Sequence, residues 1–174
     1  MAGRSDRGLI QIYTGEGKGK TTAALGTAIR ATGQGLRVGF IQFLKGEPTG
    51  EHLFVSLYQP FDIVQISTGD IFIKSQEQLK EEAQRTLAYA EEQMLGGKYD
   101  LLVLDEIFIA THKGFITIRQ VLDLLEKKPA RLELVLTGRD APPEIIERAD
   151  LVTEMRLVKH PFRRGIAARR GIEY

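Results

Sequence analysis

A glycine- and lysine-rich segment, TGEGKGKTT at residues 14–22, contains the residue types that bind phosphate. Its closely spaced glycines let backbone N–H groups turn inward around phosphate oxygens, and the N-terminus of a following helix adds favourable partial charge. Lys20 would neutralise phosphate charge, and Thr21 would coordinate Mg²⁺. The segment departs from the G-x-x-x-x-G-K-[ST] pattern because Thr14 replaces the first glycine. A glycine-rich turn with incidental lysines is the simpler alternative, but the predicted order of strand, loop and helix favours a phosphate-binding loop (P-loop).

An acidic pair, Asp105 and Glu106, follows the apolar run at residues 101–104. The run is too short for a helix and predicts a central strand that is buried on both faces. The pair is typical of a Walker B-like acidic end, which we expect beside the P-loop in the sheet and which holds Mg²⁺ directly or through water. A helix N-cap with an acidic first turn is the alternative. The sequence does not distinguish which of the two carboxylates contacts the ion.

Predicted strands and helices alternate along the chain, and this alternation would place the P-loop and the acidic pair at the ends of strands. A functional loop is expected at residues 45–51, where glycine and proline favour turns. The alternation predicts an α/β P-loop NTPase fold of the RecA-like, three-layer kind, with a mostly parallel sheet of about six strands and ligands beyond their carboxyl ends. We expect strands at residues 9–13, 38–43, 63–66, 101–104, 132–137 and 151–157, and helices at residues 21–32, 77–95, 118–127 and 142–149.

The composition is that of a globular protein with one core. The 174 residues are 43% apolar and 27% charged, which favours a single domain over residues 1–174. A net charge of +1 provides no bulk attraction to nucleic acid or to an anionic membrane. The sequence has no cysteine, which excludes disulfides and thiolate metal sites and fits a reducing compartment. Residues 1–7 are polar and no later run approaches roughly 18 apolar residues, so we expect a cytoplasmic protein without a membrane span.

Several segments together resemble the ATP:corrinoid adenosyltransferases of the cob(I)alamin or cob(I)yrinic acid a,c-diamide type. The resemblance covers nearly the whole chain, and Thr14 fits the family's version of the P-loop. The C-terminal run at residues 158–162, with Gly165, Ile166, Gly171 and Ile172, is more specific to this family than a P-loop. The matching segments are residues 14–24, 38–46, 102–107, 136–139, 149–155, 158–162 and 171–174.

The resemblance implies an unusual reaction for a P-loop protein, the transfer of the 5′-deoxyadenosyl group of ATP to the cobalt(I) of a corrinoid. The cobalt attacks the ribose 5′ carbon, and inorganic triphosphate leaves. The P-loop would then stabilise charge on a leaving group, together with Mg²⁺, Lys20 and a second positive charge from Lys18. The resemblance also implies adenosylcobalamin biosynthesis or salvage, a homodimer, and a reduced flavoprotein as a possible electron donor.

The resemblance assigns roles to individual residues of this sequence. It implies Lys20 and Glu106 as catalytic residues, and Thr21, Asp105 and Glu106 as metal ligands. The loops at residues 45–51 and 67–72 correspond to corrinoid-facing segments. The nucleotide would contact Gly15, Glu16, Gly17, Lys18, Gly19, Lys20, Thr21, Thr22 and Arg30, and the corrinoid would face Glu51, Asp70, Phe72, Lys159 and His160.

Simpler interpretations exist for some of these residues. Arg30 could be a solvated helix arginine, the usual fate of a lone arginine on a helix. Lys159 and His160 could serve structure alone. Family members often carry an aromatic pair in the loop at residues 69–72, whereas here Asp70 takes one position and Phe72 the other. The handling of the lower axial ligand could therefore differ, and the eight residues before the first strand imply a more open corrinoid site than in relatives with a longer segment.

Two other function classes fit parts of the sequence. A RecA-like ATPase or a small-molecule P-loop kinase would release ADP instead of triphosphate, but the sequence shows no clear arginine-rich lid. A nucleic-acid-binding or ATP-sensing module is suggested by Arg163, Arg164, Arg169 and Arg170. The near-neutral chain and the scarcity of stacking aromatics nearby favour a solvated or phosphate-facing role for these arginines, so no nucleic-acid partner is expected.

Overall fold

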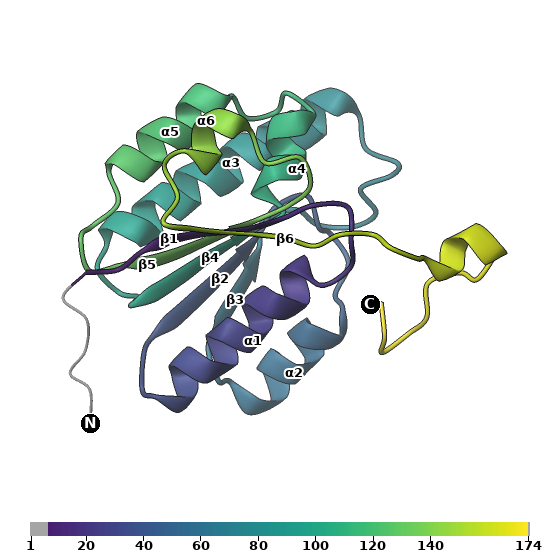
Figure 1. Ribbon diagram of the computed structural model, residues 1–174, viewed down its shortest axis with the longest axis horizontal. Coiled ribbons are helices and arrows are strands. Elements are labelled where there is room, and N and C mark those ends of the chain that lie inside the picture. Colours follow the sequence, from purple (N-terminus) through teal and green to yellow (C-terminus); the bar gives the residue numbers. More distant parts are fainter. Residues whose placement is uncertain (1–6, 174) are drawn as a thin grey trace.

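The computed structural model describes residues 7–173, in which six parallel strands form one sheet with the order β3-β2-β4-β5-β1-β6 (Figure 1). Nearly all of the polar N-terminal segment, and the last residue of the motif at residues 171–174, lie outside the described residues. The strands are β1 (Ile10–Thr14), β2 (Val38–Gln42), β3 (Asp62–Gln65), β4 (Leu101–Asp105), β5 (Glu133–Thr137) and β6 (Leu151–Glu154).

Helices cover both faces of this sheet (Figure 1). One face carries α1 (Lys20–Gly33) and α2 (Gly50–Tyr58). The other carries α3 (Gln76–Leu95), α4 (Ile107–His112), α5 (Ile118–Glu126) and α6 (Pro143–Ile146). After β6 the chain extends away from the sheet, forms the short 3₁₀-helix η1 (Pro161–Arg164) and turns back (Figure 1). The predicted α/β fold with three layers is confirmed.

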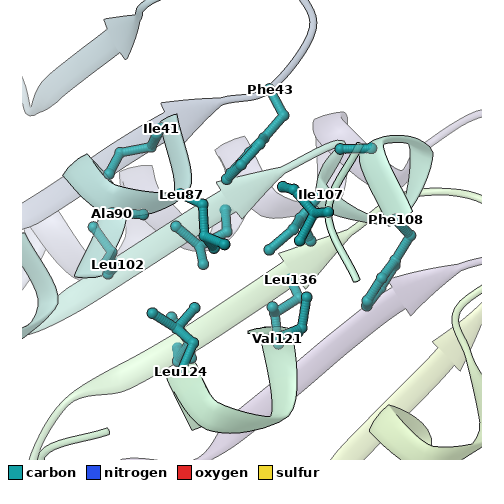
Figure 2. Close-up of a cluster of buried hydrophobic side chains, with 14 of the residues drawn as sticks. Ile41, Phe43, Leu87, Ala90, Leu102, Ile107, Phe108, Val121, Leu124 and Leu136 are labelled. Carbon is teal, nitrogen blue, oxygen red and sulfur yellow. The ribbon is translucent and has the colours of Figure 1, made fainter. Parts of the chain in front are cut away.

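Side chains of the sheet pack into two apolar clusters, one against each helical layer. In β4, Leu102 and Leu104 belong to the cluster beneath α3 and α5, part of which Figure 2 shows. Leu101 and Val103 belong to the cluster beneath α1. Successive side chains of a strand point to opposite faces, so an unbroken apolar run fills both layers. The prediction of a central strand buried on both faces is therefore confirmed.

Capping boxes begin the two helices that pack over this core. Ser75 accepts a hydrogen bond from the Gln78 N–H at 3.2 Å and starts α3, and Thr117 does the same with Gln120 for α5. In each case the glutamine side chain accepts from the backbone N–H of the capping residue. These reciprocal bonds satisfy N–H groups that a helix start leaves unpaired. The sequence pattern alone therefore defines where α3 and α5 begin.

The sheet order corrects one expectation about the acidic pair. Strand β4, which ends in Asp105, is not beside the P-loop strand β1, because β5 lies between them. The local pattern of a parallel strand does not encode its neighbours, so the sequence could not predict this insertion. Helix α1 packs against β4 and β5 as well as β1, and its N-terminus thereby bridges the gap.

Several elements differ from their predicted bounds. The helix expected at residues 142–149 is only Pro143–Ile146, because the N–H groups of Arg148 and Ala149 bond three residues back and tighten the turn into β6. Strand β6 ends at Glu154, where the next residue joins the P-loop. Helices α2 and α4 were not predicted, and α2 limits the expected loop at residues 45–51 to its first part.

None of the helices in residues 7–173 combines the length and the apolar character that crossing a membrane demands.

Candidate functional site

The P-loop connects β1 to α1 and is pressed against the segment that follows β6. The N–H of Gly17 donates to the carbonyl oxygen of Met155 at 2.6 Å. A Cβ atom at Gly15 or Gly17 would lie 2.6 Å from the same oxygen, and the φ angle of Gly15 is 96°. Only glycine fits this close approach without moving the backbone. The glycine spacing seen in the sequence therefore has a steric cause as well as a phosphate-binding one.

Lys20 begins α1 and its side chain folds back into the loop. Its Nζ donates to the carbonyl oxygens of Gly15 at 2.7 Å and of Gly17 at 2.9 Å. Burial lowers the pKa of Lys20, and the nearby Glu106 carboxylate opposes that shift. The ammonium group is thus held at the centre of the loop, where a bound phosphate group would meet it.

Thr14 closes β1 and connects the P-loop to the loop after β5. Its hydroxyl accepts a hydrogen bond from the N–H of Ala141 at 3.1 Å, and its carbonyl oxygen accepts from the N–H of Met155 at 2.8 Å. A glycine at this position would keep the second bond and lose the first. The departure from the common P-loop pattern therefore gives this chain a contact between two loops at the carboxyl edge of the sheet.

The Asp105 carboxylate is 1% exposed and accepts hydrogen bonds from three different elements. The Thr137 hydroxyl donates to Oδ1 at 2.6 Å, the Thr21 hydroxyl donates to the same atom at 3.0 Å, and the Gln42 amide donates to Oδ2 at 3.1 Å. Burial raises the pKa of Asp105, an effect that these hydrogen bonds oppose. The acidic end of β4 and the P-loop threonine are therefore brought together.

Sequence reasoning missed Gln42 and Thr137 as parts of this site. Each is the last residue of an otherwise largely apolar strand, β2 and β5 respectively. A polar residue that closes a buried parallel strand lies at the carboxyl edge, where ligands bind in such sheets. That signal could have found both residues.

Glu106 differs from its neighbour in both backbone and side chain. Its φ of 62° and ψ of 23° place it in the left-handed region, and it occupies the N-cap position of α4 without a side-chain capping bond. The alternative interpretation as a helix N-cap therefore gives the correct position of Glu106, but its side chain makes no capping hydrogen bond. Burial, then the charge of Asp105, raises the pKa of Glu106. Within residues 7–173 its buried Oε2 atom has no hydrogen-bond partner.

The oxygen atoms of these side chains fit a magnesium ion. The Thr21 hydroxyl and the carboxylates of Asp105 and Glu106 are the hard ligands that Mg²⁺ prefers, and the unpartnered Glu106 oxygen has capacity for a ligand. Residues 7–173 contain no cluster of three or more histidine, aspartate or glutamate side chains with the geometry of a metal site. Mg²⁺ commonly takes much of its coordination from substrate phosphates and water, so this sparse set is compatible with it.

The P-loop opens into a cavity of about 690 Å³. Glu106 and Arg139 line it from the loops after β4 and β5, Lys45 lines it from the loop before α2, and Glu51 lines it from the first turn of α2. Gly171, Ile172 and Glu173 approach it from the C-terminal segment. Predicted site residues that line this cavity are Glu16, Gly17, Lys18, Gly19, Lys20, Thr21, Thr22, Glu51, Glu106 and His160.

Two charged contacts shape the rim of this cavity. Lys18 donates to the carbonyl oxygen of Ile172 at 2.9 Å and to the Glu173 carboxylate at 3.0 Å, which holds the C-terminal segment over the P-loop. Across the cavity Lys45 pairs with Glu51. Burial alone would raise the pKa of Glu51, but hydrogen bonds from Lys45 and Thr49 lower it to about 2.

Other predicted residues lie outside the cavity. Arg30 is exposed on α1 and does not line it, in agreement with the simpler interpretation of a solvated arginine. Phe72 is 92% exposed, and its N–H donates to the carboxylate of Asp70 at 2.8 Å in a local turn that does not line the cavity. Lys159 lines a smaller neighbouring cavity of about 480 Å³ that His160 and Lys18 share.

Known proteins are similar to this chain over most of its length. Residues 6–174 match the family model described as ATP:corrinoid adenosyltransferase BtuR/CobO/CobP. A corrinoid adenosyltransferase of Pseudomonas aeruginosa is 38% identical over 98% of this chain and 86% of its own length. One from Sinorhizobium sp. is 40% identical over 100% of this chain and 84% of its own length. One from Escherichia coli K12 is 35% identical over 98% of this chain and 88% of its own length.

The fold has a solved counterpart of low sequence identity. The flagellar accessory protein FlaH of Methanocaldococcus jannaschii superimposes with a TM-score of 0.59 at 12% identity, covering 85% of this chain and 71% of its own. This likeness concerns the fold alone. The family match and the relatives span nearly the whole sequence. The chain belongs to the ATP:corrinoid adenosyltransferase family.

Proposed function

We propose that this chain binds the triphosphate of ATP in the P-loop cavity and transfers the 5′-deoxyadenosyl group to the cobalt(I) of a corrinoid. The observation that carries the proposal is the convergence of Lys20, Thr21 and Glu106 on one open cavity in a member of this family. In the reaction the cobalt donates an electron pair to the ribose 5′ carbon and a cobalt–carbon bond forms. The electron pair of the broken carbon–oxygen bond leaves with triphosphate.

The P-loop residues would act on the leaving group. The breaking bond adds one negative charge to the triphosphate, and the Lys20 ammonium lies in the loop that would hold it. Backbone N–H groups of residues 15–22 and the N-terminus of α1 would bind the phosphate oxygens. Charges that are already in position require little reorganisation during the reaction, so they favour the transition state over the substrate.

The two acidic residues would divide their work. Asp105 accepts a hydrogen bond from the Thr21 hydroxyl and so orients the hydroxyl oxygen. Glu106 lines the cavity and, within residues 7–173, has a carboxylate oxygen without a hydrogen-bond partner. Thr21, Asp105 and Glu106 would hold Mg²⁺ either directly or through water. When bound, Mg²⁺ would neutralise charge on the triphosphate. We propose Glu106 as the carboxylate nearer to the ion and the reacting groups.

The corrinoid would enter at the open rim of the cavity. Glu51 and His160 line the cavity and support a role there. Asp70, Phe72 and Lys159 remain proposed corrinoid-facing residues on the surrounding surface, and Arg30 remains a proposed nucleotide contact that requires ATP to reach beyond the cavity lining. The exposed Phe72 ring is available to pack against a large planar ligand.

Further properties remain proposals. Length and composition support a single domain over residues 1–174 and a cytoplasmic location, and the family resemblance supports a homodimer and a reduced flavoprotein as electron donor. The corrinoid would be cobalamin or cob(I)yrinic acid a,c-diamide, in adenosylcobalamin biosynthesis or salvage.

The test is an anaerobic assay with Mg·ATP and chemically reduced cobalamin. We expect loss of the cobalt(I) absorbance with release of triphosphate in equal amount. Parallel assays with reduced cob(I)yrinic acid a,c-diamide compare the two corrinoids. Formation of ADP and phosphate without loss of cobalt(I) would instead support a RecA-like ATPase, and ADP with a phosphorylated acceptor would support a kinase.

A further inference from the structure

Arg139 lies on the loop between β5 and α6 and lines the cavity beside the P-loop. We propose that its guanidinium binds the triphosphate of ATP and stabilises that group as it leaves, which makes Arg139 a catalytic residue alongside Lys20. The inference rests on the proposed binding of triphosphate by the P-loop. It adds a phosphate ligand from a loop more than a hundred residues away in the sequence.

The loop that carries Arg139 is held on both sides. The Thr137 hydroxyl before it donates to Asp105, and the N–H of Ala141 after it donates to the Thr14 hydroxyl. Between them Gly138 has a φ of 141°, and a Cβ atom there would lie 2.7 Å from the Cβ of Phe108 on α4. The backbone of the loop is therefore anchored to both nucleotide-binding strands, β1 and β4. Such anchoring favours a phosphate ligand, since the guanidinium is presented with little freedom in its backbone.

The side chain of Arg139 forms a weak ion pair with a residue of the P-loop. One of its terminal nitrogens, Nη1, lies 3.1 Å from Oε2 of Glu16, which is a residue of the P-loop itself. The two side chains are 56% and 54% exposed. A single ion pair between exposed side chains contributes little, whereas a guanidinium binds the oxygens of a phosphate chain with two parallel hydrogen bonds. Triphosphate can therefore displace Glu16 as the partner of Arg139.

The two lysines of the P-loop have different hydrogen-bond partners from Arg139. Lys20 is fixed by loop carbonyl groups, and Lys18 holds the Ile172 carbonyl and the Glu173 carboxylate of the C-terminal segment. Arg139 reaches the same cavity from the loop after β5, which is a separate segment of the chain. A triphosphate in the P-loop would then meet cations from two segments, and the charge that appears on bond breakage would be shared between them.

The first experiment measures binding of inorganic triphosphate to the purified full chain with Mg²⁺ by calorimetry. We expect Arg139→Gln to weaken binding about 10- to 100-fold, the range for a lost charge-assisted hydrogen bond pair, and Arg139→Lys to weaken it less. Glu16→Gln breaks the same ion pair, keeps the guanidinium and removes a negative charge beside the bound triphosphate, so binding should become tighter. Arg119→Gln, which removes an exposed arginine paired with Asp123 on α5, is the matched control and should bind as the parent does.

The opposite results would overturn the inference. If the Arg139–Glu16 pair only braces the two loops, Glu16→Gln and Arg139→Gln will weaken triphosphate binding equally. Triphosphate binding by Arg139→Gln that equals the parent's would also overturn it. Failure of the underlying function looks different, because then Lys20→Ala would bind triphosphate normally as well. Thermal unfolding of each variant shows whether a loss reflects folding, and the lysine variant provides a second substitution that retains the charge.

Kinetics give an independent readout. Arg139→Gln should lower kcat as well as raise the KM for ATP, because the charge on the triphosphate increases in the transition state. The expected loss in kcat is about 10- to 100-fold. A rise in KM with kcat unchanged would overturn the catalytic part of the proposal.

Discussion

The hydroxyl of Thr21 donates a hydrogen bond to the carboxylate of Asp105 at 3.0 Å, although 84 residues separate the two in the sequence. The bond links the start of α1 to the end of β4, although β5 separates β4 from β1 in the sheet. It directs the threonine oxygen at the start of α1 and leaves Glu106 turned toward the cavity. The adjacent acidic residues therefore have separate surroundings, and they should respond differently to substitution.

Asp105→Ala should destabilise the fold, whereas Glu106→Gln should not. The alanine leaves buried donors of Thr21, Thr137 and Gln42 without their acceptor, which costs about 2 kcal/mol or more of the free energy of unfolding. Glu106→Gln removes a buried charge that has an unpartnered oxygen, so the free energy of unfolding should stay equal or rise. Its activity should nevertheless fall about 100-fold or more. Chemical denaturation and the cobalt(I) assay separate the two effects, and equal destabilisation by both variants would contradict this division.

Thr14→Val tests the bond between the P-loop and the Arg139 loop. Valine keeps the shape of threonine but cannot accept a hydrogen bond from the partly buried N–H of Ala141, so the free energy of unfolding should fall by about 1 kcal/mol. Affinity for triphosphate should fall too, because Arg139 would be less well placed. Thr14→Ser retains the hydroxyl and should resemble the parent in both measurements. If valine and serine behave alike, the hydroxyl has no such role.

Lys20→Ala should abolish turnover. It removes the ammonium held at the centre of the P-loop, and a loss of about 100-fold or more in kcat is expected. The same variant should lose the rise in melting temperature that Mg·ATP produces in the parent protein. Lys80→Ala on the exposed surface of α3 controls for loss of one positive charge. Near-normal activity of Lys20→Ala would remove the P-loop from the mechanism.

Glu51 should contribute to the loss of stability in acid. Its pKa is about 2 in the folded protein and ordinarily 4.5, so the folded state binds fewer protons than the unfolded state between these values. The contribution is present above pH 4.5 and is lost as the pH falls toward 2. Because the pair with Lys45 is partly in water, we expect about 1 to 2 kcal/mol from it.

Denaturant titrations at a series of pH values measure this contribution. Glu51→Gln should flatten the dependence of the unfolding free energy on pH between 4.5 and 2. Glu81→Gln, on the exposed face of α3, controls for the removal of one carboxylate. An unchanged slope for Glu51→Gln would show that the Lys45 contact does not persist in solution.

Only local patterns carried the successful predictions from the sequence. The P-loop follows from glycines, Lys20 and Thr21 that are neighbours in the chain, and the helices expected at residues 77–95 and 118–127 begin within one residue of the observed starts of α3 and α5. The unbroken apolar run of β4 predicts burial on both faces because strand periodicity is also local. The family could likewise be recognised, since its motifs are continuous segments.

The tertiary structure decided which distant residues meet at the site. It placed β5 between β1 and β4, joined Thr14 to Ala141, brought Gln42 and Thr137 to Asp105, and left Arg30 outside the cavity. Each of these relationships depends on the order of strands in the sheet and on the path of loops at its carboxyl edge. Local residue patterns specify strands and helices, but the order of parallel strands results from packing of the whole chain. The sequence by itself therefore determined the phosphate-binding loop and its chemistry, while the fold determined the partners that orient it.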